Sequence, residues 1–125
     1  MPKRLPPDPA AAREFFARKL AFTMSPVELR RRILESSDLH VIDVREREDY
    51  DRGHIPGALH LSKDRWTTNS GLARGKMNVF YGHSLQCHLA AQAAVYFAKR
   101  KFPVMELLGG FREWAARQFA IERSR

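Results

Sequence analysis

Cysteine and long apolar runs are both scarce in this sequence. Its 125 residues include one cysteine, Cys87, which excludes an internal disulfide and a thiolate-cluster metal site and is typical of a reducing compartment. No apolar run approaches the ~18 residues of a membrane-spanning helix. The basic start of the chain is followed by prolines instead of an apolar signal core. We therefore expect a soluble, cytoplasmic protein with no membrane partner.

The histidines and basic residues also lack the patterns that metals and nucleic acids require. No two of the five histidines have His-x3-His spacing, so no metal site and no other cofactor is expected. Lysine and arginine total 22 against 14 acidic residues, and the net charge of +8 favours anionic ligands. Because the basic residues are dispersed and no aromatic stacking repeat is present, we do not expect a nucleic-acid partner.

Short apolar runs alternate with helix-forming segments along most of the chain. Buried-type strands are predicted at 39–44, 58–61, 77–81 and 102–108, and helices at about 26–35, at 89–101 and from 111 onward. Residues 63–76 are predicted to be a loop with at most one helical turn. This alternation predicts an α/β fold, with a central parallel sheet of about 4–5 strands and helices on both faces.

The amino-terminal 24 residues are expected to lie outside the main domain, which takes residues 25–121. Four prolines in the first nine residues exclude regular structure there. An extra helix is predicted after Pro9, with Ala12, Phe15, Phe16 and Leu20 on one side. We expect that side to dock on the main domain.

The segment after the strand 77–81 is the best candidate for a functional site. It runs from a strand end into a helix start, where backbone N–H groups lack partners and the helix dipole is positive. We therefore expect the loop to bind a small anion. Its residues are Gly82, His83, Ser84, Leu85, Gln86, Cys87 and His88.

Cys87 is the best nucleophile candidate in this loop. The free N–H groups and a protonated neighbouring histidine, His83 or His88, would favour its thiolate form. The alternative is that Cys87 simply packs against the sheet, because lone cysteines are among the most buried residue types. The sequence leaves both interpretations open.

Two separated motifs resemble those of the rhodanese family. The run from Val41 to Glu46, with Asp49-Tyr50 and then 53–58, resembles the family's entry motif, and 107–114 resembles its closing motif. The similarity extends over about residues 25–119. It implies a rhodanese-like sulfurtransferase fold, in which a cysteine at the start of the loop accepts a sulfane sulfur as a persulfide and passes it to an acceptor.

The sequence departs from this family at the loop itself. Gly82 stands at the position of the family's cysteine, and the basic residue often found at the end of the loop is absent. Ordinary thiosulfate sulfurtransferase activity is therefore expected to be weak or absent. A binding or regulatory role is favoured, with a small sulfur-containing or oxyanion ligand and, for regulation, a protein partner.

The alternative is an active persulfide sulfurtransferase in which Cys87 is the sulfur carrier. Cys87 resembles a second cysteine found in longer-looped members of the family. Phosphate-ester hydrolysis is disfavoured because the loop has no Cys-x5-Arg pattern.

Other polar and small residues of the two motifs are assigned to structure. Asp43 and Arg45 are expected to form a buried or half-buried ion pair, and His54 to hydrogen-bond with backbone. Gly109 and Gly110 separate the last strand from the last helix. Packing roles are expected for Trp66 and Trp114, and solvent exposure for Arg65, Arg74 and Lys76.

Overall fold

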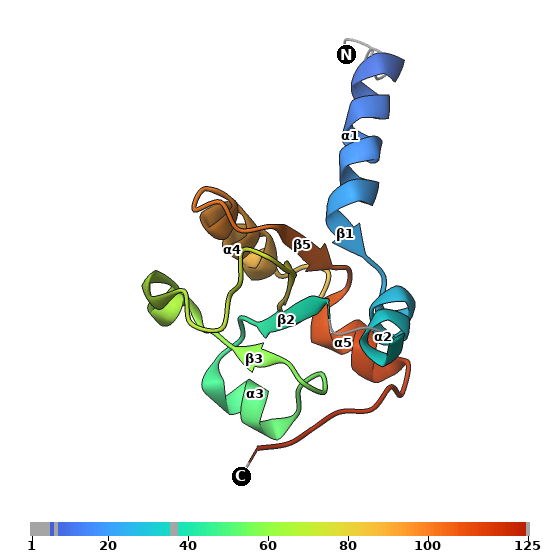
Figure 1. The fold of residues 1–125 in the computed structure, drawn as a ribbon. Coiled ribbons are helices and arrows are strands. Elements are labelled where there is room, and N and C mark those ends of the chain that lie inside the picture. Colours follow the sequence, from blue (N-terminus) through green and yellow to red (C-terminus); the bar gives the residue numbers. More distant parts are fainter. Residues whose placement is uncertain (1–5, 7, 36–37, 125) are drawn as a thin grey trace, which may run out of the picture.

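In the computed structural model, which describes residues 6, 8–35 and 38–124, the chain forms a parallel sheet between layers of helices (Figure 1). The sheet has five strands in the order β1-β5-β4-β2-β3, and every pairing is parallel. The fold class predicted from the alternation of strands and helices is thus confirmed. The strands are β1 (Thr23–Met24), β2 (Leu39–Asp43), β3 (Leu59–His60), β4 (Met77–Tyr81) and β5 (Val104–Leu107).

The helices agree with the prediction where the sequence carries apolar periodicity or a capping signal. At the start of α2, Ser25 Oγ accepts a hydrogen bond from the Glu28 N–H at 3.1 Å, as an N-cap should. The helices are α1 (Pro9–Phe22), α2 (Pro26–Glu35), α3 (Arg47–Arg52), the 3₁₀ helix η1 (Lys63–Thr68), α4 (Leu89–Ala98) and α5 (Gly110–Ala116). Helix α3 was not predicted, and α4 ends three residues before the predicted boundary.

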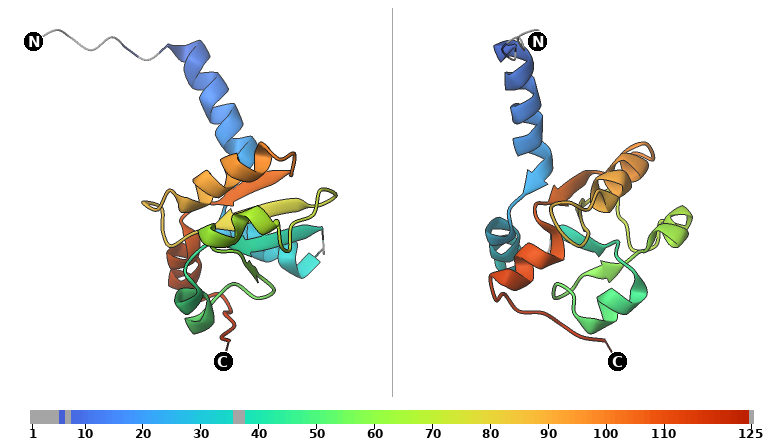
Figure 2. Two further views of the ribbon diagram at one scale, coloured as in Figure 1. Left: turned by 90° about the vertical axis from the view of Figure 1, so that its left-hand side faces the viewer. Right: turned by 180° about the vertical axis from the view of Figure 1, so that it is seen from behind.

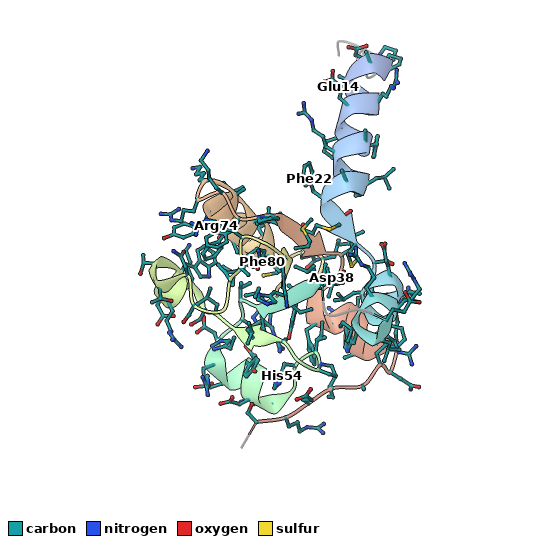
Figure 3. The ribbon with its side chains drawn as sticks, in the orientation of Figure 1. Glu14, Phe22, Asp38, His54, Arg74 and Phe80 are labelled. Atoms are coloured by element: carbon teal, nitrogen blue, oxygen red, sulfur yellow. The ribbon has the colours of Figure 1, made fainter. Side chains whose placement is uncertain are left out.

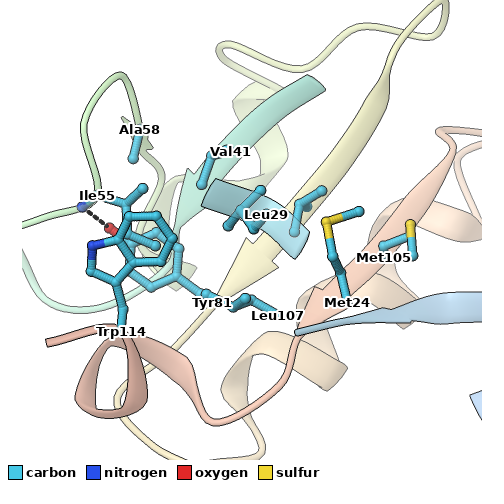
Figure 4. Packing of buried hydrophobic residues seen from close by; sticks show 10 residues of the cluster. Met24, Leu29, Val41, Ile55, Ala58, Tyr81, Met105, Leu107 and Trp114 are labelled. Atoms are coloured by element: carbon cyan, nitrogen blue, oxygen red, sulfur yellow. Dashed lines mark hydrogen bonds between the residues drawn. The ribbon is translucent and has the colours of Figure 1, made fainter. Parts of the chain in front are cut away.

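Two apolar cores form, one on each face of the sheet. On one face α2 and α5 contribute Leu29 and Trp114, which pack with residues of β1, β2, β4 and β5 (Figure 4). On the other face α4 and η1 contribute Phe97 and Trp66, together with the opposite side of the same central strands. Both tryptophan indoles also donate a hydrogen bond to a backbone carbonyl. The central strands are almost continuously apolar in sequence because they are covered on both faces.

Helix α1 projects away from the sheet, so the expected docking of its apolar side is wrong (Figure 2). Phe15, Phe16 and Leu20 remain 60%, 55% and 81% exposed. The physical reason lies at the end of the helix, because β1 begins at the next residue, Thr23. With no turn between the two elements, the helix cannot fold back over the sheet.

At both ends of the predicted domain, 25–121, residues outside it also bond to the domain. Strand β1 lies before residue 25 and pairs with β5. At the other end Glu122 forms a two-way backbone bridge with His54, and the Ser124 N–H donates to the Asp51 carbonyl at 2.9 Å. In the described residues no helix is long and apolar enough to cross a membrane.

Asn78 is fully buried near the start of the central strand β4, and its side chain holds the backbone at this end of the sheet. Its amide nitrogen donates to the carbonyls of Ala73 and Pro103 at 2.9 Å. Replacing Asn78 with alanine removes both bonds. The Ala73 carbonyl then loses this donor, whereas the Pro103 carbonyl keeps the Asn78 backbone N–H at 3.1 Å, and we expect Asn78→Ala to lower the free energy of unfolding by about 1–3 kcal/mol. Urea denaturation measures this change. The exposed Gln92→Ala should shift it by less than about 0.5 kcal/mol.

Candidate functional site

The loop 82–88 lies at the carboxyl edge of the sheet, between β4 and α4, and α5 holds it from one side. The N–H groups of Phe111 and Arg112 donate to the carbonyls of Gly82 and His83 at 2.9 and 2.8 Å. A Cβ on Gly110 would lie 2.7 Å from the Gly82 carbonyl oxygen, and Gly110 has a φ of +61°. A side chain at position 110 is therefore excluded by both space and backbone conformation. This close approach accounts for the second glycine of the closing motif.

The loop offers several backbone donors that the protein itself does not use. The Cys87 N–H donates to the Ser84 carbonyl at 3.0 Å, which closes a turn. Within the described chain, the N–H groups of the other loop residues 83–86 and of His88 donate no hydrogen bond. Helix α4 follows directly, and its start has no side-chain cap. These donors at a helix start can hydrogen-bond to an anion.

The sequence-predicted loop residues differ in exposure. Gly82 is buried, Ser84 and Cys87 are half-buried, and the remaining four are exposed: His83, Leu85, Gln86 and His88. Cys87 is therefore neither sealed in the core nor fully in solvent.

The Cys87 sulfur lies against Gly82. A Cβ built on Gly82 would be 3.1 Å from the Cys87 Sγ and 3.8 Å from the Cys87 Cβ. The absence of a side chain at position 82 thus leaves room for the sulfur of position 87. The sequence could not show this approach, because the two residues are five positions apart in a loop of irregular backbone.

The two histidines of the loop interact with carboxylates on different elements, His83 at close range and His88 through its charge. His83 Nε2 lies 3.7 Å from Asp49 Oδ2, at the start of α3. His88 is close enough to Glu106 on β5 to influence its titration: burial raises the pKa of Glu106, and the charge of His88 opposes that rise. In the sequence Asp49 belongs to the entry motif, and no sequence signal links it to His83.

A buried polar network supports the strand ends beneath the loop. Arg45 Nη2 donates to Asp43 Oδ2 at 2.7 Å and to the Gly53 carbonyl at 2.6 Å. The Tyr81 hydroxyl donates to Asp43 Oδ2 at 2.7 Å and accepts from the Ile55 N–H at 3.1 Å. Asp43 and Arg45 are 0% and 4% exposed, so the two residues form a buried ion pair.

The charges in this network shift the titration of their neighbours. Burial and the negative charge of Asp43 strongly raise the pKa of Tyr81, so its hydroxyl remains protonated and able to donate. Burial alone would lower the pKa of Arg45, but its hydrogen bonds and attraction to Asp43 raise it instead. The guanidinium also lies 4.1 Å from the centre of the Phe111 ring on α5.

His54 belongs to the framework of the entry segment. Its Nδ1 lies 2.7 Å from the Tyr50 carbonyl oxygen, and its ring stacks on the Tyr50 ring at 3.8 Å. Tyr50 in turn donates its hydroxyl proton to the Ala58 carbonyl. The hydrogen bond is to backbone, as expected of His54. In the described part of the chain, the His54 side chain makes no hydrogen bond to the loop 82–88.

A cleft of about 260 Å³ lies beside the loop, between Ser84–Gln86 and α5. Arg112 and Glu113 supply one charge of each sign to its lining. Arg112 was not singled out as a site residue, although it belongs to the closing motif. Of the basic residues before β4, Arg74 lies over the Phe102 ring and donates to the Arg100 carbonyl, away from the loop.

In the described residues, no three side chains among His, Cys, Asp and Glu gather in a way that could hold a metal ion. This edge of the sheet offers one thiol, free backbone donors and two exposed imidazoles.

Comparison with known proteins identifies the family of this chain. The family model of the Rhodanese-like domain matches residues 25–117. This chain belongs to the rhodanese-like domain family. Thiosulfate sulfurtransferase GlpE of Coxiella burnetii is 30% identical over 86 residues, which cover 67% of this chain and 78% of that relative.

Solved structures agree with the rhodanese-like fold. The BH2092 protein from Bacillus halodurans is 28% identical, with a TM-score of 0.84, and the match covers 94% of this chain and 88% of that one. The Rhodanese-like Domain Protein from Staphylococcus aureus matches with a TM-score of 0.73 at 20% identity over 83% of this chain and 99% of that one, which is a likeness of fold.

Removing one partner of the buried ion pair of this rhodanese-like domain should be strongly destabilising. Asp43→Asn leaves the Arg45 charge buried without a counterion, so we expect the free energy of unfolding to fall by about 3–5 kcal/mol. The matched control is Asp51→Asn, which removes the partner of Arg47 in a pair with a largely exposed arginine and should cost less than about 1 kcal/mol. Equal losses in urea denaturation would contradict the role given to Asp43.

The contact between positions 82 and 87 predicts a disulfide in an altered protein. The separation of 3.8 Å between the Cys87 Cβ and a Cβ at position 82 equals the mean Cβ–Cβ distance of about 3.8 Å in disulfides. We expect Gly82→Cys to lose both free thiols under mild oxidation and to regain them on reduction, as thiol titration can measure. Gly82→Ser is the control with one free thiol. A Gly82→Cys protein that keeps two reactive thiols after oxidation would show that the sulfur of Cys87 points elsewhere.

Proposed function

We propose that this rhodanese-like domain carries a sulfane sulfur as a persulfide on Cys87 and transfers it to a thiophilic acceptor. The observation that supports this role is the contact of the Cys87 sulfur with Gly82. The resemblance implies that members of the family carry the sulfur on a cysteine at the position of Gly82. Here a sulfur atom reaches the same end of the loop from position 87, and Cys87 is half-buried instead of sealed.

The transfer needs only the thiol, a sulfur donor and a nucleophilic acceptor. The Cys87 thiolate attacks the outer sulfur of a thiosulfate-type donor, the S–S bond of the donor breaks, and sulfite leaves with the electron pair. The enzyme then holds a Cys87 persulfide. A nucleophilic acceptor such as cyanide attacks the outer sulfur, and the thiolate of Cys87 is the leaving group. Neither step requires an oxidant, a reductant or a metal.

The loop beside Cys87 can bind the anionic sulfur donor of this cycle. The donor and the persulfide are anions, and the unused N–H groups of 83–86 and His88 can hydrogen-bond to them. Arg112 adds a positive charge at the neighbouring cleft. The net charge of +8 attracts anionic donors over longer distances.

Turnover should nevertheless be slow compared with relatives that have the usual cysteine. A displacement of about 1 Å in a reacting atom can cost on the order of 100-fold in rate. The Cys87 sulfur is attached to a residue at the far end of the loop, so its approach to the donor differs from that of a sulfur on residue 82. Weak thiosulfate turnover is therefore compatible with a persulfide that forms and is passed on to a better-suited acceptor.

A binding or regulatory role is the second candidate, and Gly82 is the observation that favours it. A buried glycine at the usual nucleophile position removes the family's reaction while leaving the backbone donors of the loop in place. Such a loop binds an oxyanion without exchanging sulfur. The two candidates differ in whether Cys87 forms a covalent adduct.

Intact-protein mass spectrometry after incubation with thiosulfate distinguishes the two candidates. We expect the wild-type chain to gain one sulfur atom, to lose it when cyanide is added, and to release thiocyanate in equal amount. Cys87→Ser should gain no sulfur. If the wild-type mass is unchanged at saturating thiosulfate, the persulfide proposal is wrong and the binding role is favoured.

A double variant tests whether the rest of the loop is competent. Gly82→Cys combined with Cys87→Ser returns the thiol to the family's position without the disulfide partner. We expect its cyanide-dependent thiocyanate formation to exceed that of the wild type by tenfold or more, up to on the order of 100-fold. An inactive double variant that remains folded by circular dichroism would show that the loop no longer binds the donor.

A further inference from the structure

Positive charge is concentrated in one segment of the chain. Residues 65–105 contain six lysines and arginines and neither aspartate nor glutamate, whereas the rest of the chain has 16 basic residues against all 14 acidic ones. This segment therefore carries six of the eight net positive charges. It runs from η1 through β4 and α4 to β5. No carboxylate side chain within the segment can neutralise its charges.

Five of these basic residues lie at the amino-terminal end of the sheet, where β4 and β5 begin. The Arg74 guanidinium donates to the Arg100 carbonyl at 3.1 Å. The Asn78 amide donates to the carbonyls of both Lys76 and Pro103. These bonds join the segment before β4 to the segment before β5. We call the five residues the basic cluster: Arg74, Lys76, Lys99, Arg100 and Lys101.

The basic cluster is exposed and has no counterion within the described chain. All five residues are exposed, and none forms an ion pair with a described carboxylate. By contrast, the exposed Arg31, Arg47 and Arg117 each lie 3.0–3.3 Å from a carboxylate oxygen. Figure 3 shows Arg74 on the side of the molecule where α4 ends, far from His54. Because β4 leads from the basic cluster to the loop 82–88, the two lie at opposite ends of this strand.

The two arginines of the basic cluster are held in place by aromatic rings. The Arg74 guanidinium carbon lies 4.1 Å from the centre of the Phe102 ring, and that of Arg100 lies 3.5 Å from the centre of the Tyr96 ring. Arg100 also donates to the Tyr96 carbonyl at 2.9 Å. Each guanidinium has five N–H donors and uses one of them in the described hydrogen bonds. An ordered guanidinium with free donors loses little entropy when it binds a phosphate.

We propose that the basic cluster binds the phosphate backbone of double-helical nucleic acid without reading its sequence. Each phosphate that a lysine or arginine neutralises releases a condensed counterion, and this release drives the binding. The proposal runs against the expectation from the sequence, in which the basic residues are dispersed. In the folded chain, the bond from Arg74 to Arg100 brings residues 26 positions apart into one surface.

The composition of the basic cluster favours a nucleic-acid double helix over a protein or a single strand. The centre of a protein interface is depleted of lysine, whereas protein–nucleic acid interfaces are strongly positive. Three of the five residues here are lysines. Single strands bind by stacking their bases on aromatic rings, but Phe102 is only 6% exposed and a guanidinium lies over both it and Tyr96. A double helix needs only backbone contacts.

Fluorescence anisotropy of a labelled DNA duplex of random sequence, titrated with the full chain over a series of salt concentrations, tests the proposal. We expect a dissociation constant on the order of 10⁻⁴ to 10⁻⁶ M at physiological salt. The triple variant Lys76→Gln, Lys99→Gln and Arg100→Gln should bind at least about tenfold more weakly at ~50 mM salt, and its log–log salt slope should be shallower by about 2–3. Lys99→Gln alone should change the slope by about 1.

The matched control removes the same charge from three exposed arginines that have carboxylate partners: Arg31→Gln, Arg47→Gln and Arg117→Gln. We expect it to weaken binding by less than about threefold, because charges more than a Debye length from the duplex are screened. Equal losses in both triple variants would show attraction to net charge alone and overturn the proposal. So would a duplex that stays free at ~50 mM salt, or tighter binding to polyglutamate or to anionic phospholipid vesicles. Neither the duplex nor these variants involve Cys87, so the result is independent of the persulfide proposal.

Discussion

The ion pair between Asp43 and Arg45 connects almost every element that meets at the carboxyl edge of the sheet. Arg45 holds the carbonyl of Gly53 in the entry segment and lies over the ring of Phe111 on α5. Asp43 accepts the hydroxyl proton of Tyr81, the last residue of β4 before the loop. Burying two charges is costly unless every donor and acceptor has a partner. Both carboxylate oxygens of Asp43, and the Nε and Nη2 groups of Arg45, have partners in this network, which fixes where the loop begins.

The loop is held from its outer side as well. The carbonyls of Gly82 and His83 accept hydrogen bonds from α5, and Gly110 allows the backbones to touch. Residues after α5 return along α3, where Glu122 and Ser124 bond to backbone. The carboxyl-terminal helix, its tail and the entry segment thus form one continuous support for the loop, and the two motifs of the family correspond to its two sides.

Much of this architecture is predictable because it follows from local patterns. The apolar runs gave the central strands, with β4 at its predicted boundaries, and Ser25 with Pro26 gave the start of α2. The motif residues indicate the family from the sequence alone. Strand β1 was missed because two residues carry no periodic signal, and it forms only through pairing with distant β5. Helix α3 was missed because its sequence, Arg47–Arg52, is polar apart from Tyr50.

The candidate site was predictable in position but not in geometry. A loop between a buried strand and a helix can be located from sequence, and so can its lone cysteine. The contact of the Cys87 sulfur with Gly82 depends on the loop backbone, which no periodicity describes. Positions 82 and 87 share one small space, so the side chain allowed at one depends on the side chain at the other.

The shortness of the outermost strands has a further consequence for how this molecule behaves in concentrated solution. β1 and β3 close the two sides of the sheet, and each has only two residues. An outer strand of that length leaves very few free backbone groups to which an extended foreign peptide could add. Outer strands this short therefore disfavour growth of the sheet from one molecule into the next.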